Sequence, residues 1–210
     1  MFKNILWGVD GILFDTYPAM TYALSKTVNE LGVSIGLNVI DGLARQSISH
    51  CLETLSLHFK LNPNLFRRRF YESYWKVDPA NQLPFPGVRE VCKLIHARGG
   101  LNIVVTHRDL QSTQMLMEAH NLASHFADIF SVEQGYPLKP KPAMVLAALE
   151  KYSLNPDETL LIGDREIDIQ AGRAASVRTL LVGGAKLPPP ADFQIDHYSQ
   201  LLILLQKENQ

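Results

Sequence analysis

The chain has 210 residues, of which 46% are hydrophobic and 20% are charged, and its formal net charge is −1. This composition is typical of a folded globular protein, and the near-neutral charge argues against nucleic acid as a partner, because nucleic-acid-binding domains usually carry a basic excess. No apolar run is long enough to span a membrane, and the sequence begins Met-Phe-Lys without a signal peptide. We therefore expect a cytoplasmic protein that has neither a nucleic acid nor a membrane as its partner.

The first predicted strand contains the position that decides the chemistry. The apolar run Ile5–Val9 ends at Asp10-Gly11 and predicts the first strand of a parallel sheet. Functional groups in such sheets lie just beyond the carboxyl ends of the strands, so Asp10 is a candidate site residue. Gly8 lies two residues earlier, on the same face of the predicted strand, where a second acid would complete a pair of carboxylates.

The next stretch is predicted to be entirely helical. Apolar residues recur there at three- and four-residue steps, Gly32 ends the first helix, and Asn62-Pro63 starts the last. The predicted helices cover about residues 17–32, 37–46, 48–59 and 63–76. A segment with three prolines, 78–87, is predicted to be the linker that follows them.

From Gly87 the pattern alternates between helix and strand. Predicted helices cover 87–98, 109–121, 142–152 and 166–175, predicted strands cover 101–105, 129–132, 159–162 and 179–182, and a last helix covers 198–207 after three prolines at 188–190. Such alternation is typical of an α/β fold with a doubly wound parallel sheet. We predict a core made of residues 1–15 and 80–210 and an all-helical insert, 16–79, which would cover the active face as a cap.

Polar residues follow the predicted strands at several points. Besides Asp10, they include Thr106, Lys139 in Lys139-Pro140-Lys141-Pro142, and the acids of Gly163-Asp164-Arg165-Glu166-Ile167-Asp168. Each could be a helix cap, a turn residue or a solvated side chain if it stood alone. Together they supply the acids that hold a hard cation through oxygen and the lysine and hydroxyl that bind phosphate. The sequence therefore predicts a magnesium-assisted phosphoryl site.

These motifs, in this order, resemble those of the haloacid-dehalogenase-like hydrolase superfamily, in particular its helical-capped phosphatases such as phosphoglycolate phosphatases. Members have a first strand that ends in D-x-D-G-T, a helical cap, a Thr or Ser after the second core strand, a K-P-x-P segment and G-D-x-x-x-D. The resemblance covers essentially the whole chain and implies a Rossmann-like core with an inserted helical cap. It also implies Mg²⁺ as the cofactor and a small phosphorylated metabolite as the substrate.

The resemblance implies a role for each matching residue. Thr106 would hydrogen-bond the phosphoryl group, and Lys139 would offset charge between the nucleophile and the phosphate. Asp164 would ligate magnesium, and Asp168 would support the metal site beside it. Asp10 would protonate the leaving oxygen and then activate water, while its main-chain carbonyl contacts the metal.

Three further side chains are expected to contact an anionic substrate. Arg45 belongs to Gly42-Leu43-Ala44-Arg45, which is similar to the family's substrate-facing cap loop, while His107 and Arg108 directly follow Thr106. His107 has two interpretations, a catalytic base or a loop histidine that lines the cleft, and the second is favoured.

The first motif departs from the family pattern twice. The family's nucleophilic aspartate corresponds to Gly8, and its threonine corresponds to Ile12. A register shifted by two residues would make Asp10 the nucleophile, but it would put Ile12 at the acid position and misplace the Asp-Gly turn. In the preferred, unshifted register, glycine has no carboxylate to attack phosphorus, so the covalent route is absent and magnesium affinity should fall.

The departures leave two hypotheses about function. The first is a magnesium-dependent phosphatase of a small phosphorylated metabolite, impaired or inactive because of Gly8. The second is a non-catalytic pseudophosphatase that binds a phosphorylated ligand or a protein partner. A cloning or sequencing change at position 8 is a third explanation, which Ile12 makes less attractive, since one accident would not explain both departures. A nicotinamide-binding site would need a G-x-G-x-x-G motif that is missing here, and a dehalogenase would need the same missing aspartate.

Overall fold

The computed structural model of the protein describes residues 2–184 and 190–207. Contacts between Cα atoms divide the chain into two compact units, one made of Met1–Phe14 and Pro84–Gln210 and the other of Asp15–Leu83. Two hydrophobic clusters lie in the first unit and a third lies in the second, so each unit has its own core. No helix within the described ranges is long and apolar enough to cross a membrane.

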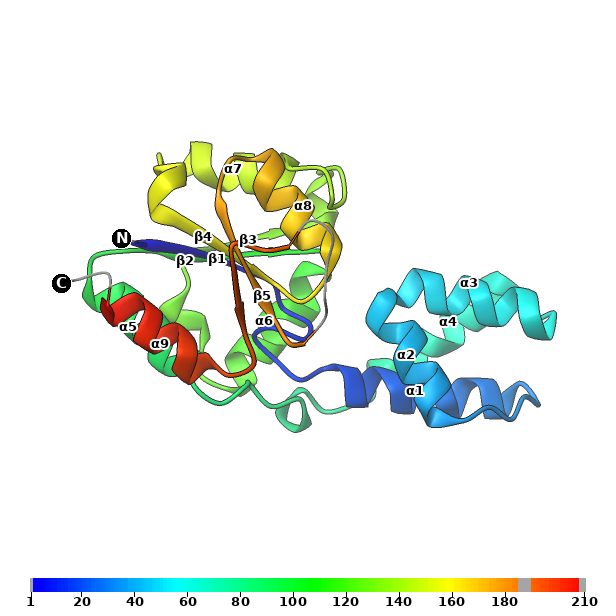
Figure 1. Cartoon of the computed structure of the whole chain (residues 1–210). Helices are drawn as coiled ribbons and strands as arrows, with labels where there is room; N and C mark the ends of the chain where they lie inside the picture. Colours follow the sequence, from blue (N-terminus) through cyan, green and yellow to red (C-terminus); the bar gives the residue numbers. More distant parts are fainter. Residues whose placement is uncertain (1, 185–189, 208–210) are drawn as a thin grey trace. The chain divides into compact units, whose positions relative to one another are not determined.

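The first unit is built on a parallel sheet (Figure 1). Within the described residues its six strands have the order β3-β2-β1-β4-β5-β6, and all neighbours are parallel. The strands are β1 Asn4–Trp7, β2 Asn102–Thr106, β3 Asp128–Ser131, β4 Thr159–Gly163, β5 Arg178–Val182 and β6 Phe193–Ile195. Every residue of β1, β2 and β4 is buried, as expected for central strands that are covered on both faces. The predicted α/β class with a doubly wound parallel sheet is confirmed.

Helices cover both faces of this sheet. The helices are α5 Val88–Ala97, α6 Leu110–Ala119, α7 Ala143–Lys151, α8 Glu166–Ala174 and α9 Tyr198–Lys207. Figure 1 shows α5 and α9 on one side of the sheet and α7 and α8 on the other. Side chains of β1 alternate between the two resulting cores: Ile5 and Trp7 pack with the cluster that includes α5 and α9, and Leu6 packs with the cluster that includes α7 and α8.

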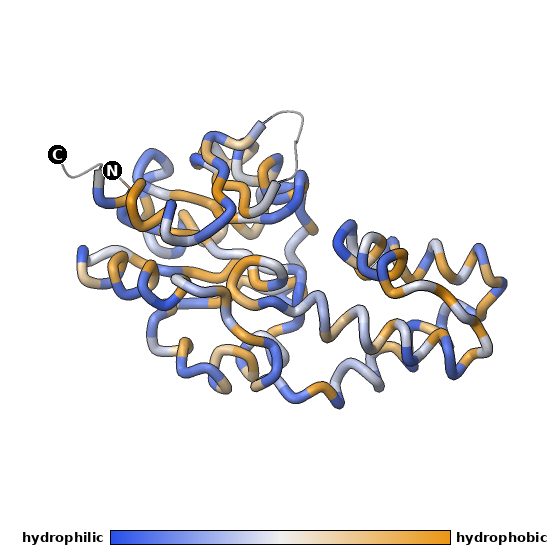
Figure 2. Tube along the Cα trace, turned by 60° about the horizontal axis from the view of Figure 1, so that its bottom comes forward, coloured by the Kyte–Doolittle hydropathy of each residue, from blue (hydrophilic) through white to orange (hydrophobic). Residues whose placement is uncertain are grey.

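The second unit is helical. It contains α1 Tyr17–Glu30, α2 Leu37–Gln46, α3 Ile48–Phe59 and α4 Pro63–Tyr74. Hydrophobic and hydrophilic residues alternate along these helices (Figure 2), and the buried ones form a core around Leu24, Leu55 and Phe66. The predicted start of α4 is confirmed, because the Asn62 side chain accepts a hydrogen bond of 3.0 Å from the Leu65 amide.

Two strands of the sheet differ from the prediction. β1 ends at Trp7 instead of continuing to Asp10, because the Val9 carbonyl accepts hydrogen bonds from the amides of Leu13 and Phe14 and so turns the chain. The edge strand β6, Phe193–Ile195, was not predicted, since three residues are too few to show a strand period. Of the three prolines before it, Pro188 and Pro189 lie outside the described residues.

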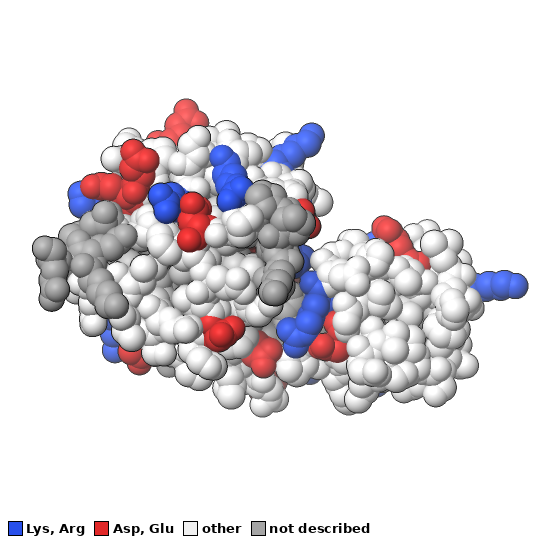
Figure 3. Space-filling view, viewed as in Figure 1, with Lys and Arg blue, Asp and Glu red and all other residues white. Residues whose placement is uncertain are grey.

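Charged residues of both signs are mixed on the surface. On the face that Figure 3 shows, lysine and arginine side chains lie among acidic ones, without a continuous basic area on the described residues of that face. The densest basic run in the sequence, 67–69, lies on α4, where Arg68 is exposed and its Nε atom lies 3.7 Å from Glu72 one turn later. This run is therefore part of a solvated helix surface.

Candidate functional site

The candidate residues of the core follow three adjacent strands. β1 lies between β2 and β4, and Trp7 at its end pairs with a residue of each neighbour. Thr106 is the last residue of β2, Asp164 directly follows β4, and Asp10 lies three residues beyond β1. Because the strands are parallel, all three lie at the carboxyl edge of the sheet.

A tight turn follows β1 and carries Asp10. The Gly8 amide still donates to the Ile162 carbonyl of β4 at 3.1 Å, so position 8 lies against the neighbouring strand. Gly11 has a φ of 72°, a conformation that favours glycine, and its amide donates to the Phe14 carbonyl at 3.0 Å. The buried Tyr198 hydroxyl of α9 donates to the Ile12 carbonyl at 2.7 Å, and this hydrogen bond ties the turn to α9.

The two departures from the expected first motif touch each other. A Cβ atom built on Gly8 would lie 3.1 Å from Cγ1 of Ile12 and 3.5 Å from the Ile162 carbonyl oxygen. Ile12 is 1% exposed and belongs to the hydrophobic core. The isoleucine side chain thus occupies the space beside position 8 into which a larger residue would extend, and the two positions are coupled by packing.

An ion pair holds the carboxylate of Asp10. Nη1 of Arg108 donates to Oδ1 of Asp10 at 2.8 Å, and the arginine side chain is 6% exposed. The main-chain amide of Arg108 donates to the Thr106 hydroxyl oxygen at 3.0 Å. That oxygen accepts one bond and the hydroxyl can still donate its proton, so Thr106 retains the donor that a phosphoryl oxygen requires.

A second ion pair lies between the ends of β2 and β4. Nζ of Lys139 donates to the carboxylate of Asp168 and, at 3.2 Å, to the Val105 carbonyl, and both charged side chains are buried. Burial alone would raise the pKa of Asp168, but the charges of Lys139 and Arg165 outweigh it and hold this pKa below its ordinary value. A Cβ atom on Gly163 would lie 2.1 Å from the Cβ of Asp168, so the close approach of α8 requires glycine there.

His107 supports the lysine from the side of β2. Its Nε2 atom accepts a hydrogen bond of 2.7 Å from the main-chain amide of Lys139. Burial, followed by the positive charges of Lys139 and Arg165, lowers the pKa of His107 to about 4, so the ring is neutral at pH 7. This contact gives His107 a positioning role in the Lys139 segment, in addition to any contact with substrate.

The three predicted metal-binding carboxylates do not form a magnesium site as they stand. Asp10 is paired with Arg108, Asp168 with Lys139, and Asp164 has Nε of Arg165 at 3.6 Å from its Oδ1 atom. Mg²⁺ binds through oxygen ligands in a near-ideal octahedron, and here each carboxylate already faces a cationic side chain. Among the described residues, no three His, Cys, Asp or Glu side chains gather as metal ligands would. The residues therefore do not fit the ion that the resemblance implies.

Arg45 lies in the helical unit and makes its contacts within α1 and α2. Its Nε atom donates to Oδ2 of Asp41 at 2.7 Å, and its guanidinium lies 4.5 Å from the ring centroid of Tyr17. About half of its side chain is exposed. These contacts hold the guanidinium in place on α2, and its predicted contact with substrate stays a prediction.

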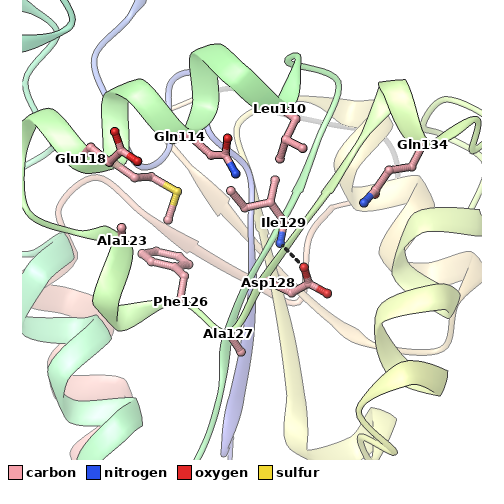
Figure 4. Close-up of a pocket in the computed structure, with 10 residues that line it drawn as sticks. Leu110, Gln114, Glu118, Ala123, Phe126, Ala127, Asp128, Ile129 and Gln134 are labelled. Atoms are coloured by element: carbon pink, nitrogen blue, oxygen red, sulfur yellow. Dashed lines mark hydrogen bonds between the residues drawn. The ribbon is translucent and has the colours of Figure 1, made fainter.

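A hollow lies beside the edge strand β3 (Figure 4). It has a volume of about 350 Å³ and lies between α6 and β3. Its lining consists of Leu110, Gln114, Met117, Glu118, Ala123, Phe126, Ala127, Asp128, Ile129 and Gln134. None of these is a predicted site residue, and none is a lysine or arginine that could bind phosphate, so the hollow is separate from the candidate site.

Two arginine roles were missed from the sequence. Arg165 was noted only as part of the G-D-x-x-x-D motif, yet it contributes to the electrostatic environment of both Asp164 and Asp168. The contact of Arg108 with substrate stays a prediction, and the structure adds that its guanidinium is bound to Asp10, 98 positions away in the sequence. An available signal is that both arginines stand two residues beyond the end of a strand, at the edge of the sheet where the candidate acids lie.

Known proteins show the same overall design. The model of the haloacid dehalogenase-like hydrolase family matches residues 5–182. The phosphoglycolate phosphatase of Nitrosospira multiformis is 30% identical over 187 residues, which make up 86% of this chain and 82% of that protein. The phosphoglycolate phosphatase of Aquifex aeolicus is 28% identical over 215 residues, or 97% of this chain and 96% of that protein.

The fold is also found among solved structures. A structure described as a predicted phosphoglycolate phosphatase from Haemophilus somnus has a TM-score of 0.85 to this chain and covers 97% of it, with 98% of its own length matched. The sequence identity of the two is 20%, so this likeness concerns the fold alone.

Proposed function

This chain belongs to the haloacid dehalogenase-like hydrolase family, and on that premise we propose that it binds a small phosphorylated metabolite with strongly impaired hydrolysis. The proposal rests above all on Gly8, which lies against β4 with Ile12 packed beside it and provides no carboxylate. Its relatives named phosphoglycolate phosphatase support a small phosphomonoester as the ligand class.

The covalent route would need a carboxylate that attacks phosphorus and is later released by water. Asp10 is two residues beyond the required position, and its carboxylate is bound to Arg108. What remains for hydrolysis is direct attack by water, with Asp10 as the base. Loss of a nucleophile from a site whose groups act together lowers the rate by about 10⁴–10⁶.

The groups that would hold the ligand are retained. Thr106 offers a hydroxyl proton, and the cationic Lys139 and Arg108 stand near it at the ends of β2 and of its neighbours. Charge-assisted hydrogen bonds from such groups are the strong ones in phosphate recognition. Arg45 and His107 are proposed as additional contacts of the substrate, as the sequence predicts.

The proposal is tested by measuring binding and turnover on one preparation. The full chain is titrated with 2-phosphoglycolate by calorimetry and incubated with a panel of small phosphomonoesters. We expect saturable binding, loss of binding in Thr106→Val, and turnover no higher than in Lys139→Ala. Turnover at a rate usual for enzymes, on the order of 1–10³ s⁻¹, would overturn the proposed impairment. Absence of binding to every member of the panel would overturn the ligand class.

A purely binding role, as in a pseudophosphatase, is the second candidate. It is favoured by the Asp10–Arg108 pair, because the carboxylate that would activate water is already engaged by a guanidinium. Turnover distinguishes the two candidates: a slow rate that disappears in Asp10→Asn supports the impaired phosphatase, and a rate unaffected by that change supports the binding protein.

A further inference from the structure

We propose that Arg108 and Lys139 hold the phosphoryl group of the ligand without a divalent cation, so that binding at this edge of the sheet is independent of metal. This inference rests on the proposed function, since it concerns the same ligand in the same place. It departs from what the family resemblance implies, namely a site that needs Mg²⁺.

The charges at the carboxyl edge are balanced without a metal ion. Three carboxylates and three cationic side chains are linked in pairs at the carboxyl edge: Asp10 with Arg108, Asp168 with Lys139, and Asp164 with Arg165. The formal charges of these six side chains cancel. An aspartate at position 8 would add a fourth carboxylate and leave a negative charge for a cation to offset. With Gly8, that excess is absent.

The carboxylate oxygens that a magnesium ion would need are already engaged. Both oxygens of the buried Asp168 are engaged, one by Lys139 and the other by the Arg165 amide at 3.2 Å. The carboxylate of Asp10 is engaged by Arg108. A magnesium ion would have to displace a hydrogen-bonded cation from each of these groups, and removing one partner from a buried pair leaves the other charge uncompensated.

Arg108 is held in place at the end of β2 before any ligand binds. Its main chain is tied to the Thr106 hydroxyl and its guanidinium to Asp10, and its side chain is 6% exposed. A guanidinium has five N–H donors in a rigid fork, so one group can serve a carboxylate and a phosphoryl oxygen at once. Little side-chain entropy is lost on binding, because the side chain is already ordered.

Lys139 supplies the second charge, beside the end of β2. Its Nζ atom is bonded to the carbonyl of Val105, the residue directly before Thr106. An ammonium group has three donors, and in this structure two of them go to Val105 and Asp168. Two buried cationic side chains thus have contacts at the end of β2, where Thr106 carries its hydroxyl, and these are the groups that an oxyanion would require.

The test uses the full chain and inorganic phosphate as the probe. Its affinity is measured by calorimetry in EDTA and in excess MgCl₂, for the natural chain and for Arg108→Met and Arg108→Lys. Arg178→Met is the matched control, because Arg178 also pairs with an aspartate, Asp192 at 3.0 Å, but begins β5 at the opposite edge of the sheet.

We expect the same affinity in EDTA and in MgCl₂, a loss of about tenfold or more in Arg108→Met under both conditions, and no change in Arg178→Met. Arg108→Lys keeps the charge, so a smaller loss is expected, and it remains informative if Arg108→Met does not fold. Binding that requires MgCl₂ would overturn the inference and leave the proposed function intact. Phosphate binding by the Arg108 variants with the same affinity as the natural chain would also overturn the inference. Absence of phosphate binding in both EDTA and MgCl₂ would overturn the proposed function, and the inference with it.

Discussion

The ends of β4 and β1 are built in opposite ways, although the two strands are neighbours and end at the same edge of the sheet. After β4, a glycine allows a buried carboxylate to approach and pair with Lys139. After β1, a glycine instead leaves room for the apolar side chain of Ile12. The side chains proposed to bind an anion thus keep their contacts, whereas the space beside position 8 is filled by core packing.

The largest effect is expected when the pair after β4 is broken. Lys139→Met leaves the buried Asp168 carboxylate without its main partner, which should lower the free energy of unfolding by about 3–5 kcal/mol. Urea unfolding measures this loss. Lys141→Met is the control, because Lys141 is exposed in the same segment and its change should stay within about 0.5 kcal/mol. Equal losses in both variants would contradict the importance of the pair.

This difference between the natural chain and Lys139→Met should shrink in acid. In the natural chain the pKa of Asp168 is held below its ordinary value, so the stability it contributes is present above the unfolded pKa of about 3.9 and is lost as pH falls through the folded pKa. In the variant, burial without the lysine raises this pKa, and protonation then relieves the buried charge. Urea unfolding as a function of pH checks the sign: a difference that grows in acid would contradict it.

Gly163→Ala should disturb the segment after β4 by crowding. The new Cβ would lie 2.1 Å from the Cβ of Asp168, a distance that forces α8 away from β4. Overpacking of this kind should lower the free energy of unfolding by about 3 kcal/mol. Gly42→Ala is the control, since no heavy atom lies within 4 Å of its built Cβ and alanine favours the helix in which it lies. A loss of stability in Gly42→Ala as large as in Gly163→Ala would point away from crowding.

The segment after β1 can be changed back to the family pattern at positions 8 and 12, which tests whether packing couples these two positions. Gly8→Asp alone places a Cβ 3.1 Å from Ile12 Cγ1, so it should destabilise the core by about 1–3 kcal/mol. Ile12→Thr removes that contact. The loss of unfolding free energy in the double variant should therefore be smaller, by about 1 kcal/mol, than the sum of the losses in the two single variants. A double-mutant cycle by urea unfolding gives the coupling energy. Additive effects would show that the two positions act independently.

The double variant should also differ in chemistry. With a fourth carboxylate at the edge, we expect Mg²⁺-dependent turnover of a phosphomonoester to appear in Gly8→Asp/Ile12→Thr and to be weaker in Gly8→Asp. The release of inorganic phosphate with and without MgCl₂ measures it. If both variants remain inactive while folded, the Asp10–Arg108 pair is the next obstacle, because it engages the acid–base carboxylate.

The sequence predicted the alternation of strands and helices well and the contacts at the carboxyl edge of the sheet poorly. Apolar strands and polar residues after them are visible in one dimension, so Thr106, Lys139 and Asp168 could be found from their positions. The contact between Gly8 and Ile12 could not, because it depends on a turn that begins earlier than the apolar run suggests. Asp10 and Arg108 follow different strands and are 98 positions apart in the sequence, so no local sequence pattern predicts that they form an ion pair.

The smallest effect on stability is expected at Arg45, in the helical unit. Its pair with Asp41 is an exposed contact across one helical turn, and its stacking on Tyr17 is partly solvated, so Arg45→Ala should lower the free energy of unfolding by only about 1 kcal/mol or less. The predicted role in substrate binding is tested separately: if Arg45 contacts the ligand, Arg45→Ala should bind 2-phosphoglycolate more weakly than the natural chain does. Lys26→Ala on α1 is a control for removal of a positive charge. Because stability and affinity are measured separately, a variant that loses neither would identify Arg45 as a surface residue of α2, and one that loses affinity alone would make it a contact of the ligand.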